Sequence, residues 1–468
     1  MFKVKYCELM MSSSVIYTII YKIDNSLTVM AEPILLGLSD KMATKSSSAP
    51  CFSNEVSRSF ISYHSDGNAQ VFRGFITDSR EFSIDNYGEE PFETFQEKVR
   101  NLLSRLWPWL PSSNYILERI KGGGYNRIVS IKVFEDFLED FTAWDKRQGT
   151  ASSYILRIPR YAFLSDVQYE VTILKFASRH INHKVPKVIQ FDTSDRNPLG
   201  RTWMLQERLP GRPLCNLYGF LNIEQKQSAV RCVSALLLDI FNITSKYAGI
   251  ISKKNTDYDF VHEVKVNQIL VPWDLEGGVP DANPAVPQTT RDFLLSLCRR
   301  QYDVHRSDNN HEYNSVWNGF ETVIDKMSMR GFLPVEDSFH FCHGDFQPRN
   351  ILVEIVDDSS IRITGIIDWD RACFGPKFVA TTSPYFFWAH HDSREDEEEQ
   401  ALYVPTMESK ATLKRIYEES VGSEFLRASY DPVYVLARKM YQILRSGIDE
   451  ERLSIAKTII QKLNERLS

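Results

Sequence analysis

The sequence of 468 residues lacks the features of several specialised protein classes. It contains no apolar run that approaches the ~20 residues of a membrane-spanning helix. Basic residues number 55 against 61 acidic residues, and the formal net charge of −6 offers no overall positive charge to nucleic acid or to an anionic membrane. We therefore expect no membrane and no nucleic acid as partners.

Cysteine is too sparse and too irregularly spaced to build a disulfide framework. The seven cysteines lie far apart, and none belongs to a C-x-x-C pair. Histidine pairs such as His180/His183 lack the spaced Cys or His partners of a zinc site. The first residues also lack the layout of a signal peptide. A reducing, cytoplasmic location is the expectation.

The length of the chain predicts more than one domain, because single hydrophobic cores rarely serve more than about 250–300 residues. The serine-rich stretch 41–54 has the composition of a linker, so we expect residues 1–54 to be a poorly ordered N-terminal extension. Residues 55–110 form a second region. Apolar residues at helical spacing over 92–106 predict an amphipathic helix in this region.

Residues 111–208 have the pattern of a small β-rich lobe. One helix is expected to interrupt its strands at about 166–179, with Ser165 as the N-cap and Gln168 reaching back to it. The expected strands are 115–120, 127–133, 154–158, 187–191 and 202–206.

Residues 209–468 are expected to form a helical lobe that contains a β-like island at 339–367. The acidic run Glu395–Glu399 is expected to be a solvated loop, because like charges repel one another. Periodic apolar residues predict helices around 223–246, 288–300, 311–328, 406–421, 431–446 and 450–467.

The β-like island carries the residues best suited to catalysis. It reads HGDFQPRN over residues 343–350 and IIDWD over residues 366–370. Phosphoryl transfer needs ligands for the metal ions that neutralise the phosphates, and a carboxylate that orients the attacking hydroxyl and takes its proton. Asn350 and Asp368 offer the oxygen ligands that Mg²⁺ prefers, and Asp345 is the candidate general base.

These motifs resemble the H-G-D-x-x-x-x-N and I-D-W-[DE] signatures of the aminoglycoside phosphotransferase and choline kinase-like family. The resemblance implies an α+β, bilobal protein-kinase-like fold with a small β-rich N-lobe and a larger, mostly helical C-lobe. It also implies an ATP- and Mg²⁺-dependent enzyme that transfers the γ-phosphoryl group to a hydroxyl of a small-molecule acceptor. Protein kinases carry H-R-D-x-x-x-x-N and D-F-G at these places, so a protein substrate is disfavoured.

The resemblance also assigns a phosphate-binding turn to the N-lobe. Gly122, Gly123 and Gly124, followed by Asn126, join the first two expected strands. Glycines in such a turn let backbone N–H groups approach phosphates closely. We therefore expect this turn to cover the phosphates of ATP.

Two further parts of the N-lobe are expected to contact the nucleotide. Arg157 stands where kinases have the nucleotide-binding lysine, and Glu170 is its expected partner. The strand before Gly211 would be the hinge between the lobes, and its backbone around 207–209 would bind the adenine. The hinge residues assigned to the cofactor are Gln206, Glu207 and Leu209.

Several neighbouring roles remain open at this point. The resemblance implies that His343 braces the catalytic loop, and Trp369 is expected to have a packing role. Asp370 either contacts the metal or substrate or forms a salt bridge, and Arg349 either stabilises the transferring phosphate or pairs with a carboxylate. A nucleotide-binding pseudokinase or scaffold without catalysis, and an enzyme that transfers AMP, are the alternatives. The sequence names neither the acceptor nor the oligomeric state.

Overall fold

The chain divides into two compact units, Met1–Phe60 and Ile61–Ser468. In the first unit, β1 (Lys5–Met11), β2 (Ser14–Ile23) and β3 (Ser26–Thr28) form an antiparallel sheet in the order β1-β2-β3. The boundary expected at residue 54 lies outside the described residues. A computed structural model describes residues 5–11, 14–23, 26–28, 89–120, 125–134, 151–160, 166–255, 263–271, 283–306, 311–336, 338–389 and 397–468.

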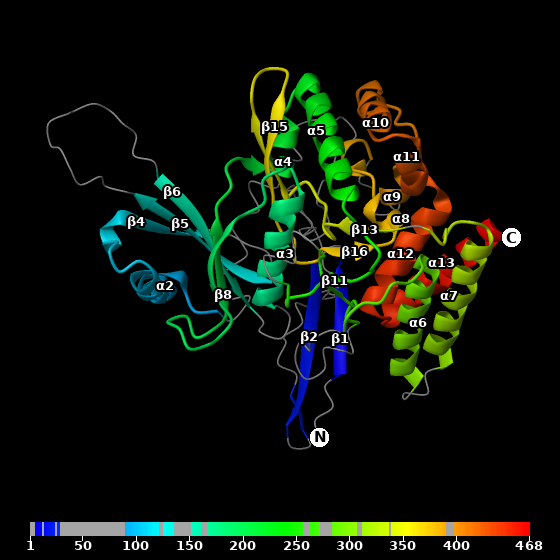
Figure 1. Ribbon diagram of the computed structural model, residues 1–468, viewed down its shortest axis with the longest axis horizontal. Coiled ribbons are helices and arrows are strands. Elements are labelled where there is room, and N and C mark those ends of the chain that lie inside the picture. The colour runs from blue at the N-terminus through cyan, green and yellow to red at the C-terminus, as the bar shows by residue number, and fades with distance from the viewer. Residues whose placement is uncertain are drawn as a thin grey trace, which may run out of the picture. The chain divides into compact units, whose positions relative to one another are not determined.

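A five-stranded antiparallel sheet forms the N-terminal part of the second unit (Figure 1). Its strand order is β4-β5-β6-β8-β7, so β6 is the central strand and lies between β5 and β8. Each of the five expected strands is confirmed. Their bounds are β4 (Tyr115–Ile120), β5 (Asn126–Phe134), β6 (Ala151–Pro159), β7 (Val188–Asp192) and β8 (Trp203–Glu207).

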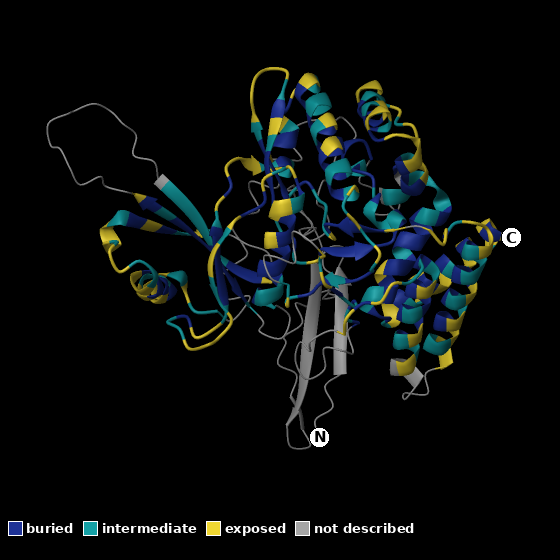
Figure 2. Cartoon of the chain, viewed as in Figure 1, coloured by how far each residue is buried: buried dark blue, intermediate teal, exposed yellow. Residues whose placement is uncertain are grey.

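The expected amphipathic helix is α2 (Phe92–Leu106), and it covers one face of this sheet. Its apolar side packs against buried residues of β5, β6 and β8, which Figure 2 shows in dark blue. Next to the helix, the Arg127 guanidinium lies 3.7 Å from the centre of the Phe95 ring, and Glu89 forms ion pairs with Arg127 and Arg160. The buried α2 residues are Phe95, Val99, Leu102 and Leu103.

Helix α3 (Val167–His180) follows β6, and its N-cap differs from the expected one. The Asp166 side chain accepts a hydrogen bond from the Tyr169 N–H at 3.2 Å. The predicted cap, Ser165, lies outside the described residues, and the helix begins two positions after it. Both residues suit an N-cap, so the sequence pattern alone chose the wrong one of two adjacent candidates.

The described residues in the rest of the second unit are mainly helical and include three small antiparallel sheets, ordered β15-β14-β9, β10-β13-β16 and β11-β12. The strands are β9 (Arg212–Pro213), β10 (Thr244–Ser245), β11 (Ile250–Ile251), β12 (Val266–Asn267), β13 (Phe339–Cys342), β14 (Ile351–Ile355), β15 (Ile361–Ile366) and β16 (Cys373–Gly375). The five-stranded sheet and this helical part together form the expected α+β fold, with a β-rich lobe and a helical lobe.

All six predicted helical segments of this part are confirmed, with shifts at their ends. Helix α5 ends at Phe241 instead of 246, because Thr244 and Ser245 pair with β13. The helices are α4 (Leu214–Leu217), α5 (Ile223–Phe241), α6 (Thr290–Arg306), α7 (His311–Met329), α8 (Lys377–Ala380), α9 (Glu397–Gln400), α10 (Glu408–Val421), α11 (Ser423–Tyr430), α12 (Pro432–Ser446) and α13 (Glu450–Leu467). Within the described residues, no helix is both long and apolar enough to cross a membrane.

The acidic run at 395–399 is not simply a solvated loop where the structure describes it. The Glu398 carboxylate pairs with the guanidinium of Arg438, a residue that is only 4% exposed. Glu399 pairs with Lys439 at 2.9 Å and with Lys462 at 3.3 Å. Basic side chains of α12 and α13 therefore offset the repulsion on which the expectation rested.

Candidate active site

The HGDFQPRN loop connects β13 to β14, and His343 braces it from within. The His343 ring lies 3.0 Å from the Ile367 carbonyl through Nε2, and its Nδ1 accepts a hydrogen bond from the Asp345 N–H at 3.3 Å. One neutral tautomer, protonated on Nε2, satisfies both contacts. Burial lowers the pKa of His343 to about 4, although the Asp345 and Asp368 carboxylates act in the opposite direction. His343 therefore holds the loop as a neutral ring.

The sharp turn after His343 requires glycine. Gly344 has φ of +79°, and a Cβ at this position would overlap the Arg371 carbonyl oxygen. Residues with a Cβ rarely adopt this backbone conformation, whereas glycine adopts it readily. Glycine at this position thus lets the chain turn between His343 and Asp345.

Three hydrogen bonds from neighbouring side chains hold the Asp345 carboxylate. Arg349 Nη2 donates to Oδ1 at 2.7 Å and to Oδ2 at 2.6 Å, while Asn350 Nδ2 donates to Oδ2 at 2.9 Å. Asn350 Nδ2 also donates to the Asp345 carbonyl at 2.9 Å. These bonds use only the amide nitrogen of Asn350, so its amide oxygen takes part in none of them.

The IIDWD motif is joined directly to the HGDFQPRN loop, because the Ile367 N–H donates to the Asn350 carbonyl at 2.9 Å. Asp368 has φ of +69° and is the one non-glycine residue with positive φ among the described residues. Such a conformation costs free energy and often occurs at functional sites. Trp369 is 1% exposed and stacks on Phe341, which matches its expected packing role.

Arg157 of β6 lies among three carboxylates. Its Nη2 lies 2.6 Å from Asp370 and 3.4 Å from Glu170, and its Nη1 lies 3.6 Å from Asp368. Burial by itself would lower the pKa of Arg157, but the carboxylates, with Asp370 foremost, outweigh burial and raise it. The expected neighbours Arg157 and Glu170 thus lie together, and Asp370 forms the salt bridge that the sequence left as one of two alternatives.

The strand register places three predicted nucleotide-binding residues on one face of the sheet. Residues directly opposite in antiparallel strands share a face, and so do residues two apart in one strand. Ile128 pairs with Arg157, which puts Asn126 on the face of Arg157. Arg157 pairs with Met204, which puts Gln206 there too. This face lies opposite the one that α2 covers.

Two buried amide oxygens on this face have no hydrogen-bond partner in the described part of the chain. They are Oδ1 of Asn126 and Oε1 of Gln206, in residues that are 8% and 6% exposed. Buried polar atoms are normally paired, and an unpaired one is a reason to look for a ligand. Gly122, Gly123 and Gly124, which were assigned to the phosphates, lie outside the described residues.

The hinge backbone is less free than expected. The Glu207 N–H donates to the Lys187 carbonyl at 2.8 Å, and the Arg208 N–H donates to the Ser153 carbonyl at 2.9 Å. An adenine would therefore have to use the Leu209 N–H or the hinge carbonyls. Gly211 allows the chain to turn after the hinge strand: its φ is +91°, and a Cβ there would overlap Thr364 Oγ1.

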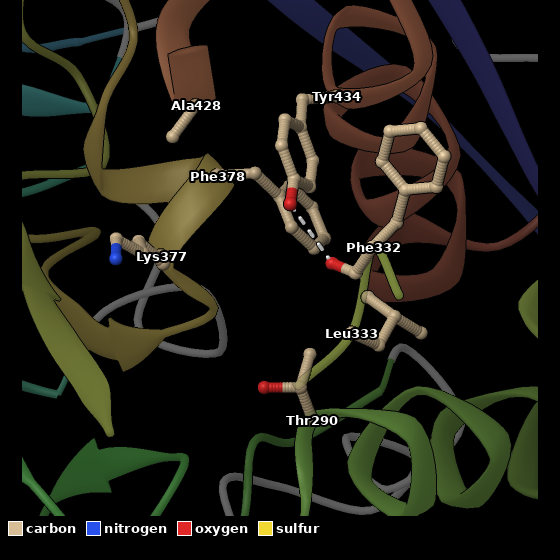
Figure 3. Close-up of a pocket in the computed structure, with 7 residues that line it drawn as sticks. All are labelled: Thr290, Phe332, Leu333, Lys377, Phe378, Ala428 and Tyr434. Carbon is tan, nitrogen blue, oxygen red and sulfur yellow. Dashed lines mark hydrogen bonds between the residues drawn. The ribbon is translucent and has the colours of Figure 1, made fainter. Parts of the chain in front are cut away.

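A small cavity lies in the helical part and contains none of the predicted site residues. Phe378 and Tyr434 stack beside it, and the Tyr434 hydroxyl donates to the Phe332 carbonyl at 3.0 Å (Figure 3). The predicted catalytic and metal-binding residues lie instead in the HGDFQPRN and IIDWD motifs. The lining residues of the cavity are Thr290, Phe332, Leu333, Lys377, Phe378, Ala428 and Tyr434.

Sequence reasoning left two partners of the site undecided. Arg349 proves to pair with the carboxylate of Asp345, and Asp370 with Arg157. The spacing of four residues between Asp345 and Arg349 was a usable signal for the first pair. The second pair joins residues 213 apart in the sequence, so local spacing could not reveal it.

Comparison with known proteins identifies a family and several relatives. The sequence model of the phosphotransferase enzyme family matches residues 139–378. A subtelomeric hrmA-associated cluster protein of Aspergillus fumigatus is 22% identical over an alignment 297 residues long, which covers 51% of this chain and 55% of that protein. The chain thus matches only about half the length of this curated relative.

Solved structures of aminoglycoside phosphotransferases are also similar. APH(4)-Ia is 17% identical, and the match covers 79% of this chain and 98% of that one with a TM-score of 0.40. The APH(2")-IIa enzyme in a ternary complex with streptomycin and ATP is 12% identical, with 80% and 97% covered and a TM-score of 0.41. A putative aminoglycoside phosphotransferase from Ralstonia eutropha is 12% identical, with 80% and 96% covered and a TM-score of 0.41.

Proposed function

Because the chain belongs to the phosphotransferase enzyme family, we propose that it transfers the γ-phosphoryl group of ATP to a hydroxyl of a small-molecule acceptor. One observation supports this most: the hydrogen bond from Ile367 to Asn350 joins the two motifs that carry the proposed base and the proposed metal ligands. The proposed base and metal ligands would then act on one phosphoryl group. We also propose that the protein acts in the cytoplasm.

We assign the nucleotide to the face of the sheet that carries Arg157. The Arg157 guanidinium would contact phosphate oxygens, since its planar group can bind two of them at once. Glu170 and Asp370 would keep it oriented through the ion pairs described above. Asn126 and Gln206 would offer their unpaired amide oxygens to donors of the nucleotide.

We assign Mg²⁺ to the amide oxygen of Asn350 and the carboxylate of Asp368. The surroundings fit a cation, because three carboxylates lie close to the single guanidinium of Arg157 in the described part of the chain. No group of three or more His, Cys, Asp or Glu side chains could hold a metal there by itself, so nucleotide phosphates and water would complete the coordination. When bound, Mg²⁺ would neutralise the phosphates during transfer.

Asp345 would act on the acceptor. Its carboxylate accepts a hydrogen bond from Asn350 Nδ2 at 2.9 Å and would accept the proton of the attacking hydroxyl. Neutral His343 holds the Asp345 backbone and takes no proton itself. This chemistry defines the acceptor as a small molecule with a hydroxyl group.

A screen of acceptors tests the proposal directly. ADP formation would be measured with ATP, Mg²⁺ and a panel of aminoglycosides, choline, sugars and amino alcohols. We expect one class to raise ADP formation above the rate without acceptor, and Asp345→Asn to lower that rate by about 10²–10⁴-fold. Mass spectrometry of the product would separate phosphoryl transfer from AMP transfer.

The second candidate is a nucleotide-binding pseudokinase. The presence of Arg157 at the position of the kinase lysine favours it, because arginine is not a conservative replacement at a packed site. The pseudokinase would bind ATP tightly and turn over no acceptor, and ADP formation would be the same in the wild type and in Asp345→Asn. This result would establish the second candidate and refute the transferase.

A further inference from the structure

We infer that Arg349 is a positioning residue for the proposed general base: its guanidinium fixes the Asp345 carboxylate so that Oδ1 is the oxygen that receives the proton of the acceptor. This inference rests on the proposed function and adds to it a residue and an atom. Arg349 had no settled role from sequence. Its contacts in the structure decide between the two that were open.

The two oxygens of the Asp345 carboxylate accept different numbers of hydrogen bonds. Oδ2 accepts from Arg349 at 2.6 Å and from Asn350 at 2.9 Å, whereas Oδ1 accepts from Arg349 alone, at 2.7 Å, among the hydrogen bonds of the described residues. A carboxylate oxygen accepts about two hydrogen bonds. Oδ2 is therefore filled, and Oδ1 keeps room for a hydroxyl.

The backbone makes this arrangement rigid on the Arg349 side. The Gln347 N–H donates to the Asp345 carbonyl, and the Asn350 N–H donates to the Gln347 carbonyl, each at 2.9 Å. The carbonyl of Pro348 is tied to the N–H of Cys215 in α4 at 3.2 Å. Arg349 thus extends from a turn that is fixed at both ends.

The ion pair is also sheltered more than an ordinary surface pair. The side chain of Arg349 is 28% exposed and that of Asp345 is 21% exposed. The exposed pair of Arg362 and Glu354, with 68% and 38% of the side chains exposed and a distance of 3.0 Å, provides a matched comparison in the same part of the fold. Charge-assisted bonds with partial burial hold a side chain in place more firmly than surface pairs.

Steady-state kinetics of three variants test the inference, with the best acceptor from the screen. Arg349→Gln should lower kcat by about 10–100-fold, because a catalytic group displaced by about 1 Å can lose that much. The KM values for ATP and acceptor should stay within about threefold, because the guanidinium contacts the base and not the substrates. Arg349→Lys should recover part of kcat, and Arg362→Gln should match the wild type.

Two results would overturn the assignment. A higher KM for the acceptor with unchanged kcat would mean that Arg349 binds the acceptor. Unchanged kcat in Arg349→Gln would mean that the base needs no help from it.

Thermal unfolding separates failure of this inference from failure of the proposed function. If no acceptor is turned over, the ion pair itself can still be tested by introducing Arg349→Gln into the wild type and into Asp345→Asn. The drop in Tm should be smaller in the Asp345→Asn background, because the charged partner is already absent there. Equal drops in both backgrounds would refute the pairing, whatever the activity.

Discussion

The imidazole of His343 lies between the Asp345 N–H and the Ile367 carbonyl in a place that excludes a charged ring. A protonated ring would present an N–H to the Asp345 N–H and lose that bond. Burial disfavours the charged ring as well, and it lowers the pKa of His343 from 6.5 to about 4. The folded protein therefore resists protonation of His343 more than the unfolded chain does.

This difference predicts a loss of stability in acid. Between pH 6.5 and about 4 the unfolded chain binds a proton at this residue and the folded chain does not, so the free energy of unfolding falls as pH falls. Above pH 6.5 the residue contributes nothing to the pH dependence, and the full loss amounts to about 3 kcal/mol. Urea denaturation at pH 7 and pH 4.5 should show a smaller pH-dependent loss in His343→Gln than in the wild type. Equal losses in the two proteins would contradict the account.

At the scale of single residues, chemistry fixes the residue type that is expected at a few positions of the HGDFQPRN and IIDWD motifs. The need for a carboxylate base and for oxygen ligands to a metal pointed to Asp345, Asn350 and Asp368 from the sequence alone, and their roles stay predictions. Arg157 shows the limit of this reasoning. Its shortest contact is with Asp370, from a distant loop, and only tertiary structure brings the two together.

Among the elements, α9 (Glu397–Gln400) depends on partners far away in the sequence. Arg438 of α12 is buried, and it donates to the carbonyls of Phe378 and Ala428 at 2.8 and 2.9 Å besides pairing with Glu398. The charge of this guanidinium is offset by Glu398. The acidic segment thereby becomes part of the packing of the helical lobe.

Two neighbouring substitutions test this dependence. Glu398→Gln should lower the free energy of unfolding by about 3 kcal/mol, because it leaves a buried guanidinium without its counter-charge. Glu399→Gln is the matched control: its side chain is 36% exposed, so the cost should stay below about 1 kcal/mol. Urea denaturation of both variants gives the comparison. Similar small losses would show that Glu398 does not stabilise the fold.

Periodicity predicted the existence of elements better than their ends. The last turn predicted for α5 is replaced by the pairing of Thr244 with His340, a contact between residues almost a hundred positions apart. At the start of α3, Asp166 caps the helix in place of the adjacent Ser165. Both outcomes depend on the local path of the chain, which the apolar pattern does not encode.

On the scale of the whole second unit, α2 is part of the core of the β-rich lobe. Four of its side chains are buried with Val129, Leu156 and Trp203 of the sheet. The sequence predicted this helix but could not predict where its apolar side would be buried. The lobe as it folds thus includes residues that precede its first strand.

Truncated chains test this conclusion. A fragment of residues 111–468 should be much less stable than one of residues 89–468, because each buried α2 side chain contributes about 1.5–3 kcal/mol. Thermal unfolding followed by circular dichroism, together with limited proteolysis, should show a lower Tm and faster cleavage in the shorter fragment. Equal behaviour of the two fragments would show that α2 is dispensable.

The pairing of β5 with β6 also bears on how such chains change in evolution. Nine residues of β5 are in register with nine of β6, yet the span that matches the family begins at residue 139, between the two strands, and ends at residue 378, inside α8. Genetic recombination that exchanged only this span would join a β6 from one ancestor to a β5 and an α12 from another. Descendants of such an exchange would fold only where the surfaces of the inherited strands and helices still matched.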